Sequence, residues 1–156
     1  MNYPIKILLL ISLLLSQNCT SFLVEEDENL KNIEHILVEK INQIRIQNNL
    51  RPLKENQLLI YLARDHCKEM IKSEKISHKS YKIRSQVISN LIYQNRYGEN
   101  VAYALSLKYM PNKVITSWLN SETHAANIYG DFNMTGIGVD MDKDGGYYIT
   151  QIFAHE

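Results

Sequence analysis

The spacing of apolar residues predicts two amphipathic helices in the first half of the chain. From residue 30 to residue 47, apolar side chains recur at steps of three and four positions, so they share one face of a helix. A second stripe with the same period runs from residue 56 to residue 73. Asn48, Asn49 and Pro52 mark the end of the first helix.

The middle of the chain is less regular. Residues 81–97 show no clean period, and we expect a short helix over residues 86–92. A glycine break at residues 98–100 leads into the apolar sequence VAYAL. Pro111 suits the first position of a further helix, where its missing N–H costs nothing, and this helix should end near Ser121.

The period changes to a β type near the C-terminus. TGIGVDM and YYITQIFA are rich in β-branched and aromatic residues, and DKDGG between them predicts a hairpin turn. DKDGG also matches the start of a calcium loop, but the twelfth position is Gln151 instead of the required glutamate, so we interpret it as a turn. Helices followed by a hairpin predict an α+β fold with an antiparallel sheet.

Composition and charge limit the class of protein. The 156 residues suit a single domain, and an apolar content of 45% is enough for a packed core. There are 17 basic and 17 acidic side chains, so the formal net charge is zero. Because there is no basic surplus, nucleic acid is not an expected partner.

Residues 1–18 are typical of an export signal. Lys6 precedes an apolar run over residues 7–15. This run is too short to cross a bilayer, which takes about 20 apolar residues. The sequence therefore predicts an exported protein.

Cys19, directly after this signal, resembles the lipid-modified cysteine of bacterial lipoproteins. Ser16 and Asn18 depart from the usual residues before such a cysteine, but the looser signals of spirochaete lipoproteins tolerate them better. Residues 19–29 would then be a lipidated, acidic tether ahead of a domain over residues 30–156, on the outer membrane or cell surface. The alternative is an ordinary secreted protein whose Cys19 carries no lipid.

The second cysteine, Cys67, lies among apolar residues of a predicted helix. We interpret it as a buried and inert thiol; the alternative is a reactive thiol. A domain with one cysteine is expected to fold without a disulfide.

Two histidines and one glutamate are the candidate functional residues. His78 and His124 each lie beyond a predicted helix and are flanked by serine or threonine, and Glu99 lies in the glycine break between them. Two imidazoles and a carboxylate can hold a divalent metal such as zinc, or form a hydrogen-bonded cluster without metal. The other histidines are predicted to be solvated or capping residues: His35, His66 and His155.

Six segments in chain order resemble the CAP superfamily of cysteine-rich secretory proteins, venom antigens and plant pathogenesis-related class 1 proteins, in its bacterial SCP-type branch. The resemblance covers residues 30–154 and implies a three-layer α-β-α sandwich with helices on both faces of an antiparallel sheet. The segments are INQIRIQNNLRPL, LLIYLARDHCKEM, ISHKS, GENVA, SWLNSETHAANI and TGIGVDM with GGYYITQIFA.

The resemblance also implies a polar cleft made by two histidines and two glutamates. His78, His124 and Glu99 match three of these positions and are the implied ligands of a weakly bound metal. Ser121 stands where the eukaryotic pattern has the second glutamate, and Glu122 follows it. Trp118 is expected in the core beneath His124. Three further polar residues are expected to make hydrogen bonds behind the cleft and orient a histidine: Asn100, Asn127 and Gln151.

These features favour a membrane-anchored surface protein that binds a host protein or a small lipid ligand. One alternative is a metal-assisted, protease-like hydrolase, and another is a structural envelope lipoprotein. Some eukaryotic relatives bind sterols at sites shaped by disulfides. This chain lacks those cysteines, so we do not extend sterol binding to it.

We predict that Cys19 carries the lipid anchor, because it follows an apolar run that is too short to span a bilayer. Two or more acyl chains make such an attachment stable. Metabolic labelling with palmitate should tag the wild-type protein and leave Cys19→Ala untagged. Cys67→Ala is the control and should be tagged like the wild type. Equal labelling of wild type and Cys19→Ala would contradict the prediction.

Overall fold

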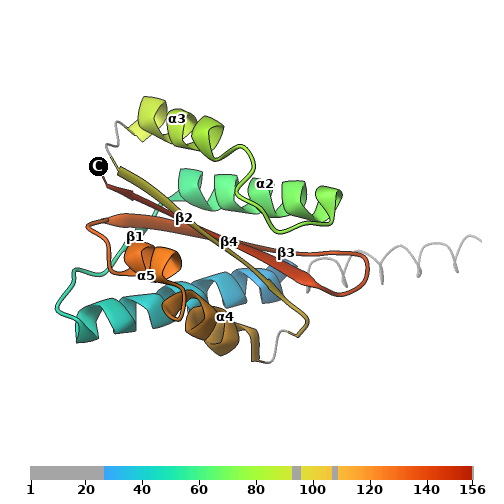
Figure 1. Cartoon of the computed structure of the whole chain (residues 1–156), viewed down its shortest axis with the longest axis horizontal. Helices are drawn as coiled ribbons and strands as arrows, with labels where there is room; N and C mark the ends of the chain where they lie inside the picture. Colours follow the sequence, from blue (N-terminus) through green and yellow to red (C-terminus); the bar gives the residue numbers. More distant parts are fainter. Residues whose placement is uncertain (1–26, 93–95, 107–108, 156) are drawn as a thin grey trace, which may run out of the picture. The chain divides into compact units, whose positions relative to one another are not determined.

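The computed structural model describes residues 27–92, 96–106 and 109–155 (Figure 1). The chain divides into two compact units, Met1–Asn32 and Ile33–Glu156, and the sheet and the candidate site belong to the second. The predicted export signal and Cys19 lie outside the described residues. In the described ranges, no helix has the length and apolar character needed to cross a membrane.

A four-stranded sheet forms the middle layer, with the strand order β1-β3-β4-β2. β3 (Met134–Met141) and β4 (Tyr147–His155) form the predicted hairpin, and β2 (Arg96–Ala104) pairs antiparallel with β4. The short β1 (Lys54–Glu55) pairs parallel with β3. The α+β prediction is therefore confirmed, with the correction that the sheet is mixed.

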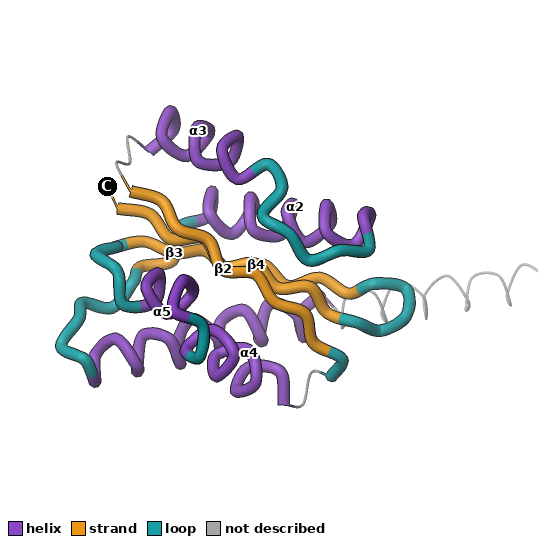
Figure 2. The backbone as a smooth tube through the Cα atoms, viewed as in Figure 1, coloured by secondary structure: helices purple, strands orange, loops and turns teal. Residues whose placement is uncertain are grey.

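Helices cover both faces of the sheet in the second unit, which confirms the three-layer sandwich (Figures 1 and 2). α2 (Gln57–Ser73) and α3 (Tyr81–Ile92) lie on one face. α4 (Met110–Leu119), α5 (Glu122–Ile128) and the part of the first helix that belongs to this unit, residues 33–47, lie on the other.

The predicted and observed helices differ mainly in the residue at which they begin. The second helix is confirmed, and Asn56 caps it by accepting hydrogen bonds from the first-turn amides. The first helix starts at residue 27, so the last three residues of the predicted tether are helical. α3 starts at Tyr81, five residues before the predicted start, because its inward face opens with the buried Arg84 and carries little apolar signal.

Besides the two-residue β1, two elements were not predicted. β2 includes the glycine break at residues 98–100, where a strand was not expected. α5 has only seven residues, so it is too short to display a helical period. Both elements carry residues of the candidate site.

Two glycines of β3 let α2 lie directly on the sheet. A Cβ atom added at Gly136 would lie 2.2 Å from the backbone nitrogen of Ile60, and one at Gly138 would lie 2.3 Å from that of Arg64. Any side chain at these positions would push α2 away. The two glycines thus fix the depth at which α2, and the loop after it, sit above the sheet.

Arg45 is a buried charge that holds the loop after α5. Its side chain is 2% exposed and donates hydrogen bonds to the carbonyl oxygens of Ile128 (2.7 Å), Gly130 (2.9 Å) and Phe132 (3.0 Å). A fourth bond goes to the carbonyl of Arg51. The guanidinium therefore pairs with backbone acceptors that are buried or partly buried.

Cys67 is fully buried, as predicted. Its thiol lies 3.2 Å from the carbonyl oxygen of Gly138, and burial raises its pKa to about 12. The inert interpretation is thus supported, because the thiolate is the reactive form.

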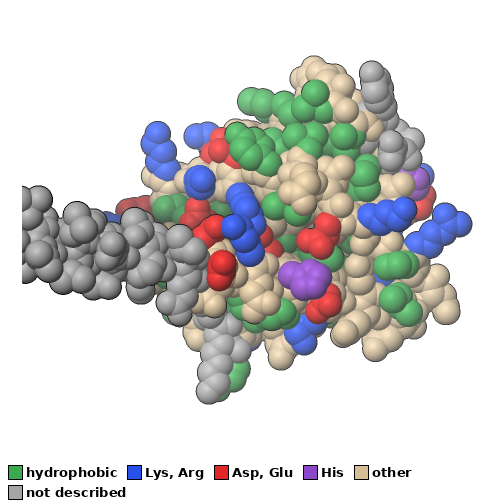
Figure 3. Space-filling model, turned by 180° about the vertical axis from the view of Figure 1, so that it is seen from behind, with side chains coloured by type: hydrophobic (Ala, Val, Ile, Leu, Met, Phe, Trp, Pro, Cys, Tyr) green, Lys and Arg blue, Asp and Glu red, His purple; other side chains and the backbone are tan. Residues whose placement is uncertain are grey.

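The face in Figure 3 carries lysine and arginine side chains interspersed with acidic ones, and they do not gather into a basic patch. This distribution agrees with the zero net charge.

Arg45→Lys is expected to lower the free energy of unfolding by about 3 kcal/mol, because an ammonium group cannot reach all the carbonyls and leaves some buried acceptors unpaired. Urea unfolding followed by circular dichroism measures this loss. Arg51→Lys is the control: its side chain is exposed, and its backbone carbonyl still accepts the bond from Arg45. Equal stability of the two variants would contradict the role of Arg45.

Candidate functional site

A buried carboxylate lies at the centre of the candidate site. Glu99, on β2, has a side chain that is 0% exposed. Arg84 of α3 donates two hydrogen bonds to it, from Nε at 2.8 Å and from Nη2 at 2.9 Å. The hydroxyl of Tyr97 donates a third, at 2.8 Å. The two parallel bonds from Arg84 form a bidentate ion pair, which is both stronger and more specific in direction than a single neutral hydrogen bond.

His78 joins Glu99 from the loop after α2. Its Nδ1 lies 2.9 Å from Glu99 Oε1, while 46% of its side chain is exposed. A carboxylate can only accept, so Nδ1 carries the proton and Nε2 of the neutral ring keeps the free lone pair. Glu69, which contacts Arg84 at 3.2 Å, extends the cluster toward α2.

His66 also belongs to this cluster, so the prediction that it is a solvated or capping residue is wrong. It is 1% exposed, and its Nε2 donates to the carbonyl oxygen of Ser77 at 2.8 Å. Its Nδ1 lies 3.1 Å from Glu69, and Nε2 is 3.7 Å from Glu99. His66 thereby fixes the loop that carries His78.

His124 approaches from the opposite face of the sheet, on α5. Its ring centroid lies 6.2 Å from that of His78, with the two rings tilted by 38°. The site therefore encloses the free edge of β2. Two asparagines place α5 there: Asn100 donates to the carbonyl of His124 at 3.2 Å, and Asn127 donates to Asn100 and to the carbonyl of Glu99. Both bond to the backbone and not to an imidazole nitrogen.

The remaining predicted residues do not complete a group of four. Ser121 precedes α5 as its N-cap residue, and Glu122 is exposed in the first turn of that helix. Gln151 is buried on β4 and donates to Thr135, away from the histidines. Trp118 is in the core as predicted, 1% exposed, and donates to the carbonyl of Val101 at 3.0 Å.

The surroundings of Glu99 and His124 shift the pKa values of both groups. Burial alone would raise the pKa of Glu99, but the hydrogen bond from His78, the charge of Arg84 and the Tyr97 hydroxyl together lower it below its ordinary value. Burial, aided by the charge of His78, lowers the pKa of His124. At neutral pH the site therefore holds an ionised Glu99 and a neutral His124.

The geometry does not fit the predicted metal site of His78, His124 and Glu99. Among the described residues, no group of three or more His, Cys, Asp or Glu side chains is arranged to hold a metal ion. Glu99 already accepts bonds from Arg84, Tyr97 and His78, so a cation would have to displace a guanidinium. The guanidinium of Arg84 already supplies the positive charge that a metal ion would bring to Glu99.

Comparisons with known proteins define the family. Residues 38–153 match the model of the CAP, or cysteine-rich secretory protein, family, and the chain belongs to that family. It is 31% identical over 121 residues to the uncharacterized protein YkwD of Bacillus subtilis (strain 168), a match that covers 76% of this chain. The chain spans only 46% of that relative.

Solved structures share the fold. An outer surface protein from Borrelia burgdorferi superposes with a TM-score of 0.71 at 20% identity, covering 81% of this chain and 94% of that protein. An extracellular protein with an SCP domain from Bacillus anthracis str. Ames gives 0.63 at 25% identity, covering 83% and 41%. These similar proteins are an outer-surface and an extracellular protein.

The lowered pKa of His124 makes stability depend on pH. As the pH falls below about 6.5, the unfolded chain takes up a proton that folded His124 resists, so the free energy of unfolding should decrease. His124→Asn should lack this part of the decrease. A further loss below about pH 4.3, where Glu99 is protonated only in the unfolded chain, should remain in both proteins.

Urea unfolding at a series of pH values from about 3 to 8 measures both windows. His35→Asn is the control, because the His35 side chain is 59% exposed and should leave the profile unchanged. Identical slopes for wild type and His124→Asn between about pH 5 and 7 would show that His124 does not contribute.

Proposed function

We propose that this chain is an exported, membrane-anchored CAP-domain lipoprotein that acts as a surface binding module. The export signal and Cys19 support the anchor, and the extracellular and outer-surface relatives are consistent with display outside the cell. The polar cleft of His78, Glu99 and His124 is the proposed recognition site. A protein or small ligand of the host is the proposed partner.

The observation that supports a binding role is the contrast between Glu99, which is buried and fixed by hydrogen bonds, and the two histidines, which lie at the open rim of the cleft. Glu99 is buried and held by Arg84, so it orients His78 and is not free to react. The exposed His78 and the half-buried His124 remain at the rim with rings 6.2 Å apart. Two imidazoles so placed can both donate to a carboxylate or phosphate group of a ligand once they are protonated.

A hydrolytic role is the second candidate. The pairing of His78 Nδ1 with Glu99 is the arrangement that orients a histidine general base, with Nε2 free to take a proton. This candidate requires a nucleophile beside His78, either a water molecule or a group of the substrate. A metal ion that would activate such a water does not fit the site.

Anion binding at the rim distinguishes these roles. In NMR titrations of the full-length chain in detergent, acetate and inorganic phosphate should shift the ring signals of His78 and His124 saturably. The effect should strengthen as the pH falls from about 8 to about 5, because His124, with its lowered pKa, donates to an anion more strongly once protonated. His78→Ala should abolish the shifts, and His35→Ala should preserve them.

Other outcomes would favour the alternatives. Cleavage of a casein or ester substrate that disappears in His78→Ala, with folding intact, would support the hydrolase. No anion effect, together with a large loss of stability in His78→Ala, would identify the cluster as a structural brace. Saturable binding of zinc by wild type but not by His124→Ala would restore the metal site.

A further inference from the structure

β2 is an edge strand, and side chains pair with most of the carbonyls on its free edge. In an antiparallel pair, alternate residues turn their backbone groups toward the partner strand and away from it. The outward carbonyls of β2 belong to Tyr97, Glu99 and Val101, because each accepts a hydrogen bond from a side chain outside the sheet. The donors are Tyr81 to Tyr97 (3.2 Å), Asn127 to Glu99 (3.1 Å) and Trp118 to Val101 (3.0 Å).

The next residue in this series is Tyr103. The pairing of β2 with β4 continues through Tyr103↔Tyr148 and Ala104↔Tyr147, so the alternation also holds at Tyr103. Its amide and carbonyl therefore turn toward the free edge. In the part of the chain that the structure describes, neither group has a hydrogen-bond partner. The outward carbonyls are thus paired at Tyr97, Glu99 and Val101, and the outward carbonyl of Tyr103 is open.

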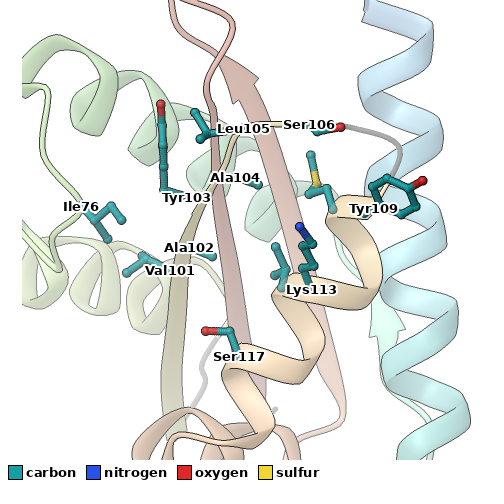
Figure 4. Close-up of a pocket in the computed structure, with 12 residues that line it drawn as sticks. Ile76, Val101, Ala102, Tyr103, Ala104, Leu105, Ser106, Tyr109, Lys113 and Ser117 are labelled. Atoms are coloured by element: carbon teal, nitrogen blue, oxygen red, sulfur yellow. The ribbon is translucent and has the colours of Figure 1, made fainter.

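A groove of about 540 Å³ lies along this open end. Figure 4 shows β2 in its middle, Ile76 on one side, and Lys113 and Ser117 reaching from α4 on the other. Ala102 and Ala104 have small side chains, which leave the space beside the strand open. The other lining residues are mostly apolar: Val101, Leu105, Tyr109, Met110 and Val114, with Ser106 as the exception.

We propose that this groove binds an extended peptide segment, which pairs with the backbone of Tyr103 and adds a strand to the edge of β2. An unpaired donor and acceptor on one strand edge is the feature that strand addition uses, and flanking pockets supply side-chain specificity. A purely apolar ligand would leave both backbone groups unpaired. Lys113 is the cation of the lining, so it favours a peptide with an acidic residue.

This inference goes beyond the proposed function, because it concerns a different recognition surface. It needs neither the histidine pair nor the lipid anchor, and it is tested with variants outside the cleft. Loss of anion binding at His78 would therefore leave peptide binding intact, and the reverse also holds.

A displayed library of random heptapeptides, selected on the full-length chain in detergent, tests the proposal. Enriched peptides should contain an acidic residue. They should bind at least about tenfold more weakly to Tyr103→Pro than to Tyr103→Ala, because both variants lose the ring but only proline lacks the amide donor. Proline is tolerated where an edge-strand N–H faces outward, and thermal melting of both variants verifies folding.

Two further measurements do not depend on that variant. Two versions of an enriched peptide are compared, one methylated at its odd-numbered backbone nitrogens and one at its even-numbered ones. One version should bind the wild-type chain at least about tenfold more weakly than the unmodified peptide, and the other should bind almost as well. Lys113→Glu should remove the preference for acidic residues. The proposal is overturned if selection enriches no peptide over an empty support. It is also overturned if neither set of methylated nitrogens weakens binding and Tyr103→Pro binds as tightly as Tyr103→Ala.

Discussion

The buried ion pair between Glu99 and Arg84 is the interaction on which the candidate site depends. A carboxylate with no exposed surface is costly to bury, and the two bonds from Arg84 compensate for the lost water. The pair joins α3 to β2. Glu99 then holds His78, and Glu69 links Arg84 to the buried His66 on α2. Helix, loop and strand are therefore positioned by one charge cluster.

The same ion pair gives Glu99 and the two histidines different roles in the site. Because its oxygens already accept bonds from Arg84, Tyr97 and His78, Glu99 acts by orienting its neighbours. The atoms that remain open to a ligand are those of the imidazoles at the rim, one from each face of the sheet. A recognition surface that wraps the edge of β2 follows from this geometry, and the groove beside Tyr103 continues along the same edge.

The sequence predicted the parts of the fold that follow a regular period. α2 and the β3–β4 hairpin show clear helical and β patterns and were found where expected. β2 was missed because its first half contains a glycine, two charged residues and an asparagine. α5 was missed because seven residues are too few to show a helical period. In the site, family motifs indicated His78, Glu99 and His124. Arg84 and His66 were missed because polar residues are normally counted as outward-facing, and here buried charges satisfy each other.

Cys67 has a practical consequence for work on this protein. It is the free thiol of the described residues, it has no exposed surface, and its proton is held well above physiological pH. An oxidant in the surrounding solution therefore has little access to it. In the domain over residues 30–156, which does not include Cys19, a pair of cysteines introduced on the surface could be coupled to spin labels or fluorophores without first removing Cys67. Distances across the edge of β2 would then be measurable in an otherwise unmodified domain.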